Sequence, residues 1–203
     1  MNASTRSTGR TVLVAVRAMV LLTVVLGIVY TLVITGIGQL ILPAQANGSL
    51  VQEHGKTVGS SLIGQSFSTA KGKPLAQYLQ PRPSAAGNGY DAGASSGSNY
   101  GPENPELIKA IAARRKQVAE FNGVSASEVP VDAVTASASG LDPQISPEYA
   151  AIQVDRIARE RGISAQEVRK VVARFTNGRD LGYLGEPTVN VVQVNLALDE
   201  LRG

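Results

Sequence analysis

Hydroxyl and glycine residues gather in one short stretch, VTASASGLDPQISPEYA, which covers residues 134–150. Ser137 and Ser139 could offer hydroxyls to a phosphate, and Gly140 would let backbone N–H groups approach an anion closely. A helix expected to begin at Pro147 would add the positive end of its dipole. One interpretation of the stretch is therefore a nucleotide contact.

The other interpretation is an ordinary turn followed by a helix cap. Asp142-Pro143 favours a turn, Ser146 is a typical N-cap residue, and Pro147 suits the first helical position. The stretch contains no lysine or arginine, and the chain lacks the G-x-x-x-x-G-K-[ST] pattern of a phosphate-binding loop. A structural or subunit-contact role is therefore favoured over direct ATP contact.

Catalytic chemistry has little support in the composition. The chain has no cysteine and a single histidine, His54, so we expect no catalytic residue and no bound metal. The enzymatic alternative is a membrane-anchored serine hydrolase, in which a desolvated lysine would take the serine proton. No G-x-S-x-G motif is present. The candidate bases lie mostly in polar or exposed contexts: Lys56, Lys71, Lys73, Lys109 and Lys116.

An uncharged apolar stretch occupies residues 18–42. As a helix it would be roughly 37 Å long, against a hydrocarbon core of about 30 Å. Arg6, Arg10 and Arg17 precede it, and Glu53 is the first acidic residue after it. This asymmetry predicts a single-pass protein of the plasma (inner) membrane, with residues 1–17 in the cytoplasm and residues 43–203 outside it.

A cleaved signal peptide is the alternative to this retained anchor. Ala44-Gln45-Ala46 has the A-x-A form of a cleavage site. Signal peptides, however, carry apolar regions of only about 7–15 residues, and this stretch is longer, so a retained anchor is favoured.

The expected membrane helix carries small and polar side chains at every fourth position. They form one ridge among leucine, valine and isoleucine, and small residues at this spacing let a second helix approach closely. The sequence therefore predicts a partner-helix face beyond simple contact with membrane lipid. Its members are Thr23, Gly27, Thr31, Thr35 and Gln39.

The remaining residues predict one small α+β domain. We expect a hairpin within residues 48–67 with His54 at its turn, and a long polar loop over residues 80–104. Helices are expected after the cap residues Asn104 and Ser146, and after the Ser164 capping box. Strands are expected over 128–138 and 187–198, the second with a short helix as an option for its end.

The second and third expected helices flank Gly162 and carry several arginines, as a helix-turn-helix DNA-binding motif would. Those charges are mixed with Asp155, Glu160 and Glu167, which indicates a solvated face. The formal charge of +3 is also mild, and the predicted topology places the motif where there is no DNA. We therefore expect no nucleic-acid partner.

Several motifs occur together in a recognisable order along the chain. They are QANGSL (45–50), GSSLIGQSF (59–67), RPSA (82–85), SNYGPENPEL (98–107), VTASASGLDPQISPEYAAIQVDRIA (134–158) and GEPTVNVVQVNLALDEL (185–201). In this combination the chain resembles the C subunit of the Kdp potassium-transporting ATPase. The likeness runs from the anchor almost to the last residue.

The resemblance implies a noncatalytic subunit of an ATP-driven, high-affinity potassium import complex. Its implied partners are a potassium-channel-like subunit, a P-type ATPase subunit and a small membrane peptide. The subunit would act in assembly and as a catalytic chaperone that raises the ATP affinity of the ATPase subunit. ATP is thus the implied cofactor, by direct contact or only through the ATPase subunit.

The resemblance also implies which residues would hold nucleotide. The SASGLD run, Ser137 to Asp142, is likened to an ABC-type signature, and Gln153 is the implied partner glutamine. Gln144 stands where many relatives carry histidine. Direct ATP contact conflicts with the predicted topology, because ATP is cytoplasmic and this stretch is expected outside.

Overall fold

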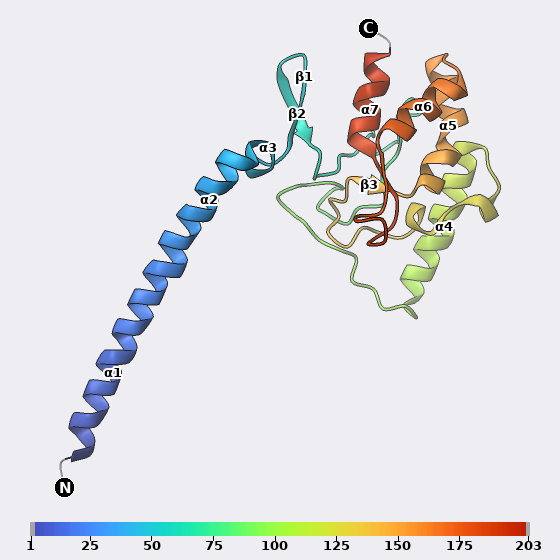
Figure 1. Ribbon diagram of the computed structural model, residues 1–203. Coiled ribbons are helices and arrows are strands. Elements are labelled where there is room, and N and C mark those ends of the chain that lie inside the picture. Colours follow the sequence, from blue (N-terminus) through green and yellow to red (C-terminus); the bar gives the residue numbers. More distant parts are fainter. Residues whose placement is uncertain (1–2, 202–203) are drawn as a thin grey trace. The chain divides into compact units, whose positions relative to one another are not determined.

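The computed structural model describes residues 3–201, with side chains described from residue 8 onward. The chain divides into two compact units, residues 1–49 and 50–203. Figure 1 labels helices and strands of both units.

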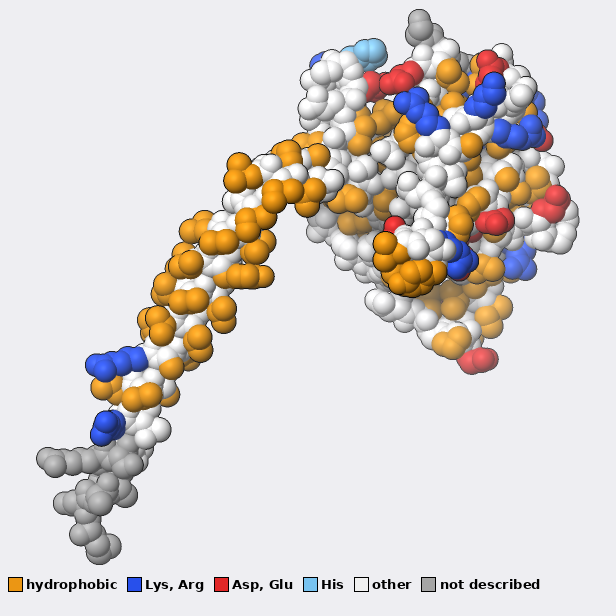
Figure 2. All heavy atoms as spheres, viewed as in Figure 1, with side chains coloured by type: hydrophobic (Ala, Val, Ile, Leu, Met, Phe, Trp, Pro, Cys, Tyr) orange, Lys and Arg blue, Asp and Glu red, His pale blue; other side chains and the backbone are white. Residues whose placement is uncertain are grey.

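The first unit is a continuous run of helix. It consists of α1 (Ala3–Leu22), a π-helical segment η1 (Thr23–Val29), α2 (Tyr30–Ile41) and the short α3 (Pro43–Ala46). The 34 residues Thr8–Ile41 are long and apolar enough to cross a membrane, and none of their side chains is buried in the structure. In Figure 2 hydrophobic side chains surround this helix, with basic side chains towards its N-terminal end.

The second unit opens with the expected hairpin. Strand β1 (Leu50–Glu53) pairs antiparallel with β2 (Lys56–Ser60). His54 and Gly55 form the turn, both with positive φ, of 47° and 77°. His54 is exposed, as expected for a solvated turn residue.

Three helices form where their caps predict them. Helix α4 (Pro105–Asn122) begins after Asn104, whose side chain accepts from the Glu106 N–H, and α5 (Pro147–Arg161) begins after Ser146. Helix α6 (Ala165–Arg174) begins with a complete Ser164–Glu167 capping box. Gly123 and Gly162 end α4 and α5 in the left-handed conformation that glycine adopts readily.

The strand expected over residues 128–138 is wrong. That region holds two short 3-10 turns, η2 (Ala126–Glu128) and η3 (Val131–Ala133). Pro130 has no N–H to donate to a sheet, and the Thr135 hydroxyl bonds back to the Val131 carbonyl at 2.9 Å. The β-branched Val129 and Val134 are buried here without strand pairing.

The strand expected over residues 187–198 is largely a helix. Only β5 (Thr188–Asn190) is extended, and α7 (Val191–Glu200) follows at once. The Asn190 side chain caps this helix by accepting from the Gln193 N–H at 3.1 Å. The buried positions recur with helical spacing, which outweighs the β propensity of the valines. Val191, Val194, the polar Asn195 and Leu198 follow this spacing, and Val192 and Ala197 beside them are also buried.

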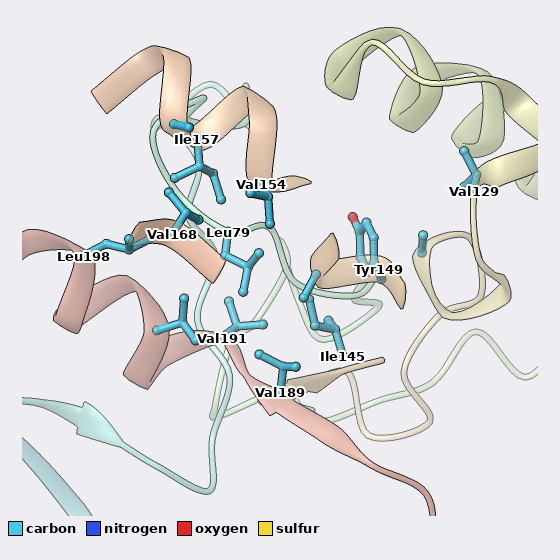
Figure 3. Packing of buried hydrophobic residues seen from close by; sticks show 14 of the residues in the cluster. Leu79, Val129, Ile145, Tyr149, Val154, Ile157, Val168, Val189, Val191 and Leu198 are labelled. Carbon is cyan, nitrogen blue, oxygen red and sulfur yellow. The ribbon is translucent and has the colours of Figure 1, made fainter. Parts of the chain in front are cut away.

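A small antiparallel sheet and three helices enclose the core. The strand order is β3 (Gln144–Ile145), β5 and β4 (Thr176–Asn177), with Ile145 opposite Val189. Helices α5, α6 and α7 pack together over a cluster that Figure 3 shows from close by. The cluster includes Leu79, which lies in a segment with no helix or strand of its own.

Candidate functional site

The stretch that could hold a phosphate folds as a tight turn closed by its own side chains. The Ser137 hydroxyl accepts from the Gly140 N–H, and the Ser139 hydroxyl accepts from the Leu141 N–H, each at 3.1 Å. Gly140 has a φ of 69°, and a Cβ there would lie 2.7 Å from the Ala86 nitrogen. The turn thus requires glycine, and both hydroxyls already serve its geometry.

The polar loop of residues 80–104 packs against this turn. The Ser137 N–H donates to the Pro83 carbonyl at 2.9 Å, and the Ser84 hydroxyl donates to the Gly140 carbonyl at 2.6 Å. Further along, the Ser96 N–H donates to the Ser139 carbonyl at 2.9 Å. The loop has neither helix nor strand up to Asn104, as expected, yet it is fixed at both ends of the turn.

Arg82 supplies the positive charge that the stretch itself lacks. One of its terminal nitrogens forms a 2.9 Å ion pair with Asp142. The other donates to the carbonyls of Thr135 and Ala136, both at 3.4 Å. This cation lies 60 residues from Asp142 in sequence, so no local motif reveals it. Its charge is already paired with a carboxylate.

A surface hollow of about 530 Å³ lies beside the turn. Ser139, Leu141 and Arg82 line it together with Leu62 and Ile63, which follow the hairpin. Leu62 and Ile63 are exposed at 63% and 40%. The hollow therefore presents mainly apolar side chains, with one paired cation and hydroxyls that already accept bonds.

Gln153 lies apart from the turn, in the interior. Its carbonyl oxygen accepts from the Gln80 N–H at 2.7 Å, and its amide nitrogen donates to the Gln80 carbonyl at 3.2 Å. Asn195 binds Leu79 in the same manner, at 2.7 and 2.9 Å. Two side-chain amides thus take the place of a neighbouring strand for these two buried residues.

Two buried arginines complete this arrangement. Arg156 donates to the carbonyls of Ala76 and Tyr78, to Gln153 and to Asn122. Arg161 donates to the Gln77 and Leu198 carbonyls, both at 2.7 Å, and pairs with Asp199. The four side chains that hold residues 76–80 are named the polar clamp below: Gln153, Arg156, Arg161 and Asn195.

The electrostatics of the clamp are uneven. Arg161 pairs with a carboxylate, whereas the partners of Arg156 are all neutral oxygens. Burial lowers the pKa of Arg156 to about 10, so its guanidinium is still charged at neutral pH. Its plane also lies over the Phe121 ring, 4.5 Å from the centroid, which offsets part of the desolvation cost.

The described side chains bear on the two alternatives considered from the sequence, a DNA-binding motif and a serine hydrolase. Arg156 and Arg161 face the interior, so the arginines flanking Gly162 do not form one basic surface for DNA. Every lysine of the chain is exposed, so none is desolvated as the base of a serine hydrolase would be.

Sequence reasoning located the turn but missed the clamp. The available signal was the spacing of Gln153 and Arg156 along the apolar face of α5, next to Val154 and Ile157. Polar side chains on a buried face need partners, and these partners lie 73 to 80 residues away in a segment without regular structure.

The predicted partner-helix face lies along η1 and α2. Gly27 falls within η1, and a Cβ placed there would meet nothing within 4 Å. Gln39 is partly engaged, because its side-chain amide exchanges bonds of 3.0 and 3.3 Å with that of Asn47. Thr23, Thr31 and Thr35 are exposed.

The fold is thus that of an α+β domain preceded by one apolar helix long enough to span a membrane. The family model "KdpC: K+-transporting ATPase, c chain" matches residues 12–200. This chain belongs to that family.

Relatives of this family match the chain over most of its length and of their own. The potassium-transporting ATPase KdpC subunit of Kineococcus radiotolerans is 53% identical over 173 residues, which is 85% of each chain. That of Mycobacterium tuberculosis H37Rv is 49% identical over 193 residues, covering 95% of this chain and 99% of the relative. That of Methylococcus capsulatus is 51% identical over 181 residues, covering 89% and 92%.

Proposed function

We propose that this subunit of a potassium-transporting ATPase is noncatalytic and acts in assembly and stabilisation of the complex. The proposed partners are a potassium-channel-like subunit, a P-type ATPase subunit and a small membrane peptide. The observation that carries the proposal is the apolar helix Thr8–Ile41, none of whose side chains is buried. Lipid covers part of such a helix, and the ridge of small residues gives partner helices a surface on which to pack.

The ridge can be tested by enlarging one of its residues. A Cβ at Gly27 would meet nothing within 4 Å in this chain, so the larger side chain of Gly27→Leu is expected to act mainly on a neighbouring helix. Gly36→Leu is the matched control, because it also enters open space on the same helix but lies off the ridge. We expect Gly27→Leu to reduce co-purification with the other subunits while membrane insertion stays normal. Equal co-purification of both variants would refute the ridge.

We also propose that the domain stands outside the cytoplasm. Arg10 and Arg17 lie at the N-terminal end of the helix, and no acidic residue precedes Glu53, which supports this orientation. The chain lacks cysteine, so a single one can be introduced at exposed Ala70 or, as the opposite marker, at Thr8. A membrane-impermeant thiol reagent should label Ala70→Cys, but not Thr8→Cys, in sealed cells. The reverse pattern would invert the topology.

The chaperone role follows as a second proposal, and we propose that it works through the ATPase subunit. The hydroxyls of Ser137 and Ser139 already accept bonds within their turn. The oxygen and the nitrogen of the Gln153 side-chain amide both bind the Gln80 backbone. These contacts favour an effect on ATP affinity transmitted by subunit contact over nucleotide held by Ser137, Ser139, Gly140 and Gln153.

Calorimetry separates the two versions of this role. The isolated full-length subunit in detergent should show little or no heat of ATP binding, while its addition to the remaining complex should lower the ATP concentration needed for half-maximal turnover. Micromolar ATP binding by the isolated subunit that is lost in Ser139→Ala, with unchanged melting, would establish direct contact.

A further inference from the structure

A second concavity lies in the domain, away from the Ser137–Asp142 turn hydroxyls. It is a cavity of about 260 Å³, bounded by α4, by the loop residues 66–90 and by the first turn of α5. Drug-sized ligands occupy pockets of about 300–1,000 Å³, so this one has room for a single small group. None of the features described above accounts for it.

Tyr149 is a buried residue that lines this cavity, and its hydroxyl has no hydrogen-bond partner among the described residues. The residue is only 3% exposed. Figure 3 shows the Tyr149 hydroxyl pointing away from Ile145 and Val189. Burial raises the pKa of Tyr149 above its ordinary value, so the hydroxyl stays protonated and can donate. A buried polar group without a partner is rare in native proteins.

The charged side chains that line the cavity are positive, and they differ in how many hydrogen-bond partners they have. Arg114 lines it, and its guanidinium makes a 3.1 Å donation to the Val134 carbonyl. Among the described residues, none of those lining the cavity is acidic. The nearby carboxylate Asp132 already accepts two bonds from Ser146, at 2.7 and 2.8 Å. Behind the wall, Arg156 adds a buried positive charge whose hydrogen-bond partners are neutral.

Donors reach the cavity from several sides. The guanidinium of Arg114 and the amide of Gln117 come from α4, and the Tyr149 hydroxyl comes from α5. Ser66 and Ser68, from the segment that follows the hairpin, also line the cavity. A tetrahedral anion has acceptor oxygens in several directions, whereas a carboxylate presents two in one plane. The arrangement therefore suits a phosphate.

We propose that this cavity binds a single phosphate group, which Arg114 pairs with and the Tyr149 hydroxyl donates to. The site is distinct from the turn of Ser137, Ser139 and Gly140, and it does not depend on the proposed role in assembly. The phosphate comes either from solution or from the headgroup of an anionic lipid, since both present the same chemistry.

The test titrates the full-length subunit in uncharged detergent and follows its melting temperature or binding heat. One arm adds inorganic phosphate at constant ionic strength, and the other adds a short-chain phosphatidylglycerol, with phosphatidylcholine for comparison. We expect saturable binding in at least one arm, and the arm that binds more tightly identifies the source. Losing a charge-assisted bond should weaken binding about tenfold in Arg114→Gln. Tyr149→Phe, which keeps the ring, should weaken it by a smaller factor.

Arg115→Gln is the matched control, because it removes the same charge from an exposed position one residue along α4. It should bind as the unchanged protein does. Saturable binding that survives in Arg114→Gln and Tyr149→Phe would overturn the proposal. So would equal weakening in Arg115→Gln, or no saturable binding in either arm.

Discussion

Two parts of the long connection between β2 and α4 are held in different ways. Residues 76–80 cross the interior, where side chains of α5 and α7 satisfy their backbone groups. Residues 83–97 lie on the outside of the Ser137–Gly140 turn and are held mainly by bonds to its backbone. The first part depends on a few distant polar side chains, and the second depends on the shape of one turn. A connection without helix or strand can therefore have its backbone groups satisfied by distant side chains or by a packed turn.

The largest effect is expected from breaking the polar clamp at Arg156. Arg156→Met keeps the apolar stem but leaves the Ala76 and Tyr78 carbonyls and the Asn122 side chain without this donor. Each buried acceptor left without its donor costs about 1–3 kcal/mol, and three acceptors lose this donor here. Urea denaturation of the full-length chain in detergent, followed by far-UV circular dichroism, measures this. Exposed Arg159→Met should change the unfolding free energy little; equal losses in both would contradict the clamp.

The second-largest loss of unfolding free energy is expected from a change in the Ser137–Gly140 turn. Gly140→Ala combines a φ of 69° with a Cβ 2.6 Å from the Ser96 carbonyl oxygen. Strain and overlap together should cost roughly 2–4 kcal/mol of unfolding free energy. The cut rate at residues 85–97 under limited proteolysis should rise as that loop separates from the turn.

Gly178→Ala serves as the control, because no atom lies within 4 Å of a Cβ there and its φ is not positive. Unchanged proteolysis of the loop in Gly140→Ala would show that the turn does not hold it.

A smaller loss is expected at Gln153, since Asn195 still holds the neighbouring residue. Gln153→Met has nearly the same volume but cannot bond to the Gln80 N–H and carbonyl. Leaving these groups unsatisfied should cost roughly 1–3 kcal/mol. Hydrogen exchange of the Gln80 amide should accelerate more than that of the Leu79 amide. Equal acceleration at both would mean that the two amides act as one unit.

The smallest effect belongs to a purely local contact outside both regions. Hydrogen bonds from Ser164 lower the pKa of Glu167 below its ordinary value. Because the folded pKa is the lower one, this stabilisation is present above the unfolded pKa and is lost as pH falls through the folded value. In Ser164→Ala the Glu167 pKa, followed by carboxyl NMR shifts, should move up towards the ordinary value. An unmoved pKa would assign the shift to another cause.

Local sequence signals predicted the local structure well. The caps at Asn104, Ser146 and Ser164 predicted where three helices begin, and Gly123 and Gly162 predicted where two of them end. The apolar run and the His54 turn were likewise recognisable. Each of these depends on residues within about one helical turn or one hairpin of each other.

Non-local structure was not predictable from these patterns. Composition marked residues 80–104 as a polar loop, but nothing nearby shows that Gln80 is buried or that Arg82 pairs with Asp142. The β-branched valines of 191–194 indicated a strand, although tertiary burial on one face favours a helix. The nucleotide residues implied by resemblance stay a prediction, and the structure adds that Gln153 is separated from the turn by its role in the clamp.

The π-helical segment η1 affects the direction in which the ridge residues point around the helix axis. An α-helix turns once every 3.6 residues, whereas a π-helix closes its bonds between residues i and i+5 and holds more residues in a turn. Residues four apart are therefore rotated by more than a full turn about the helix axis in α2 and by less than a full turn in η1. The two deviations have opposite signs. The line from Thr23 through Gly27 to Thr35 is straighter than a uniform α-helix would make it. A uniform α-helix over the same residues would make the ridge drift around the helix by about 40° for every four residues.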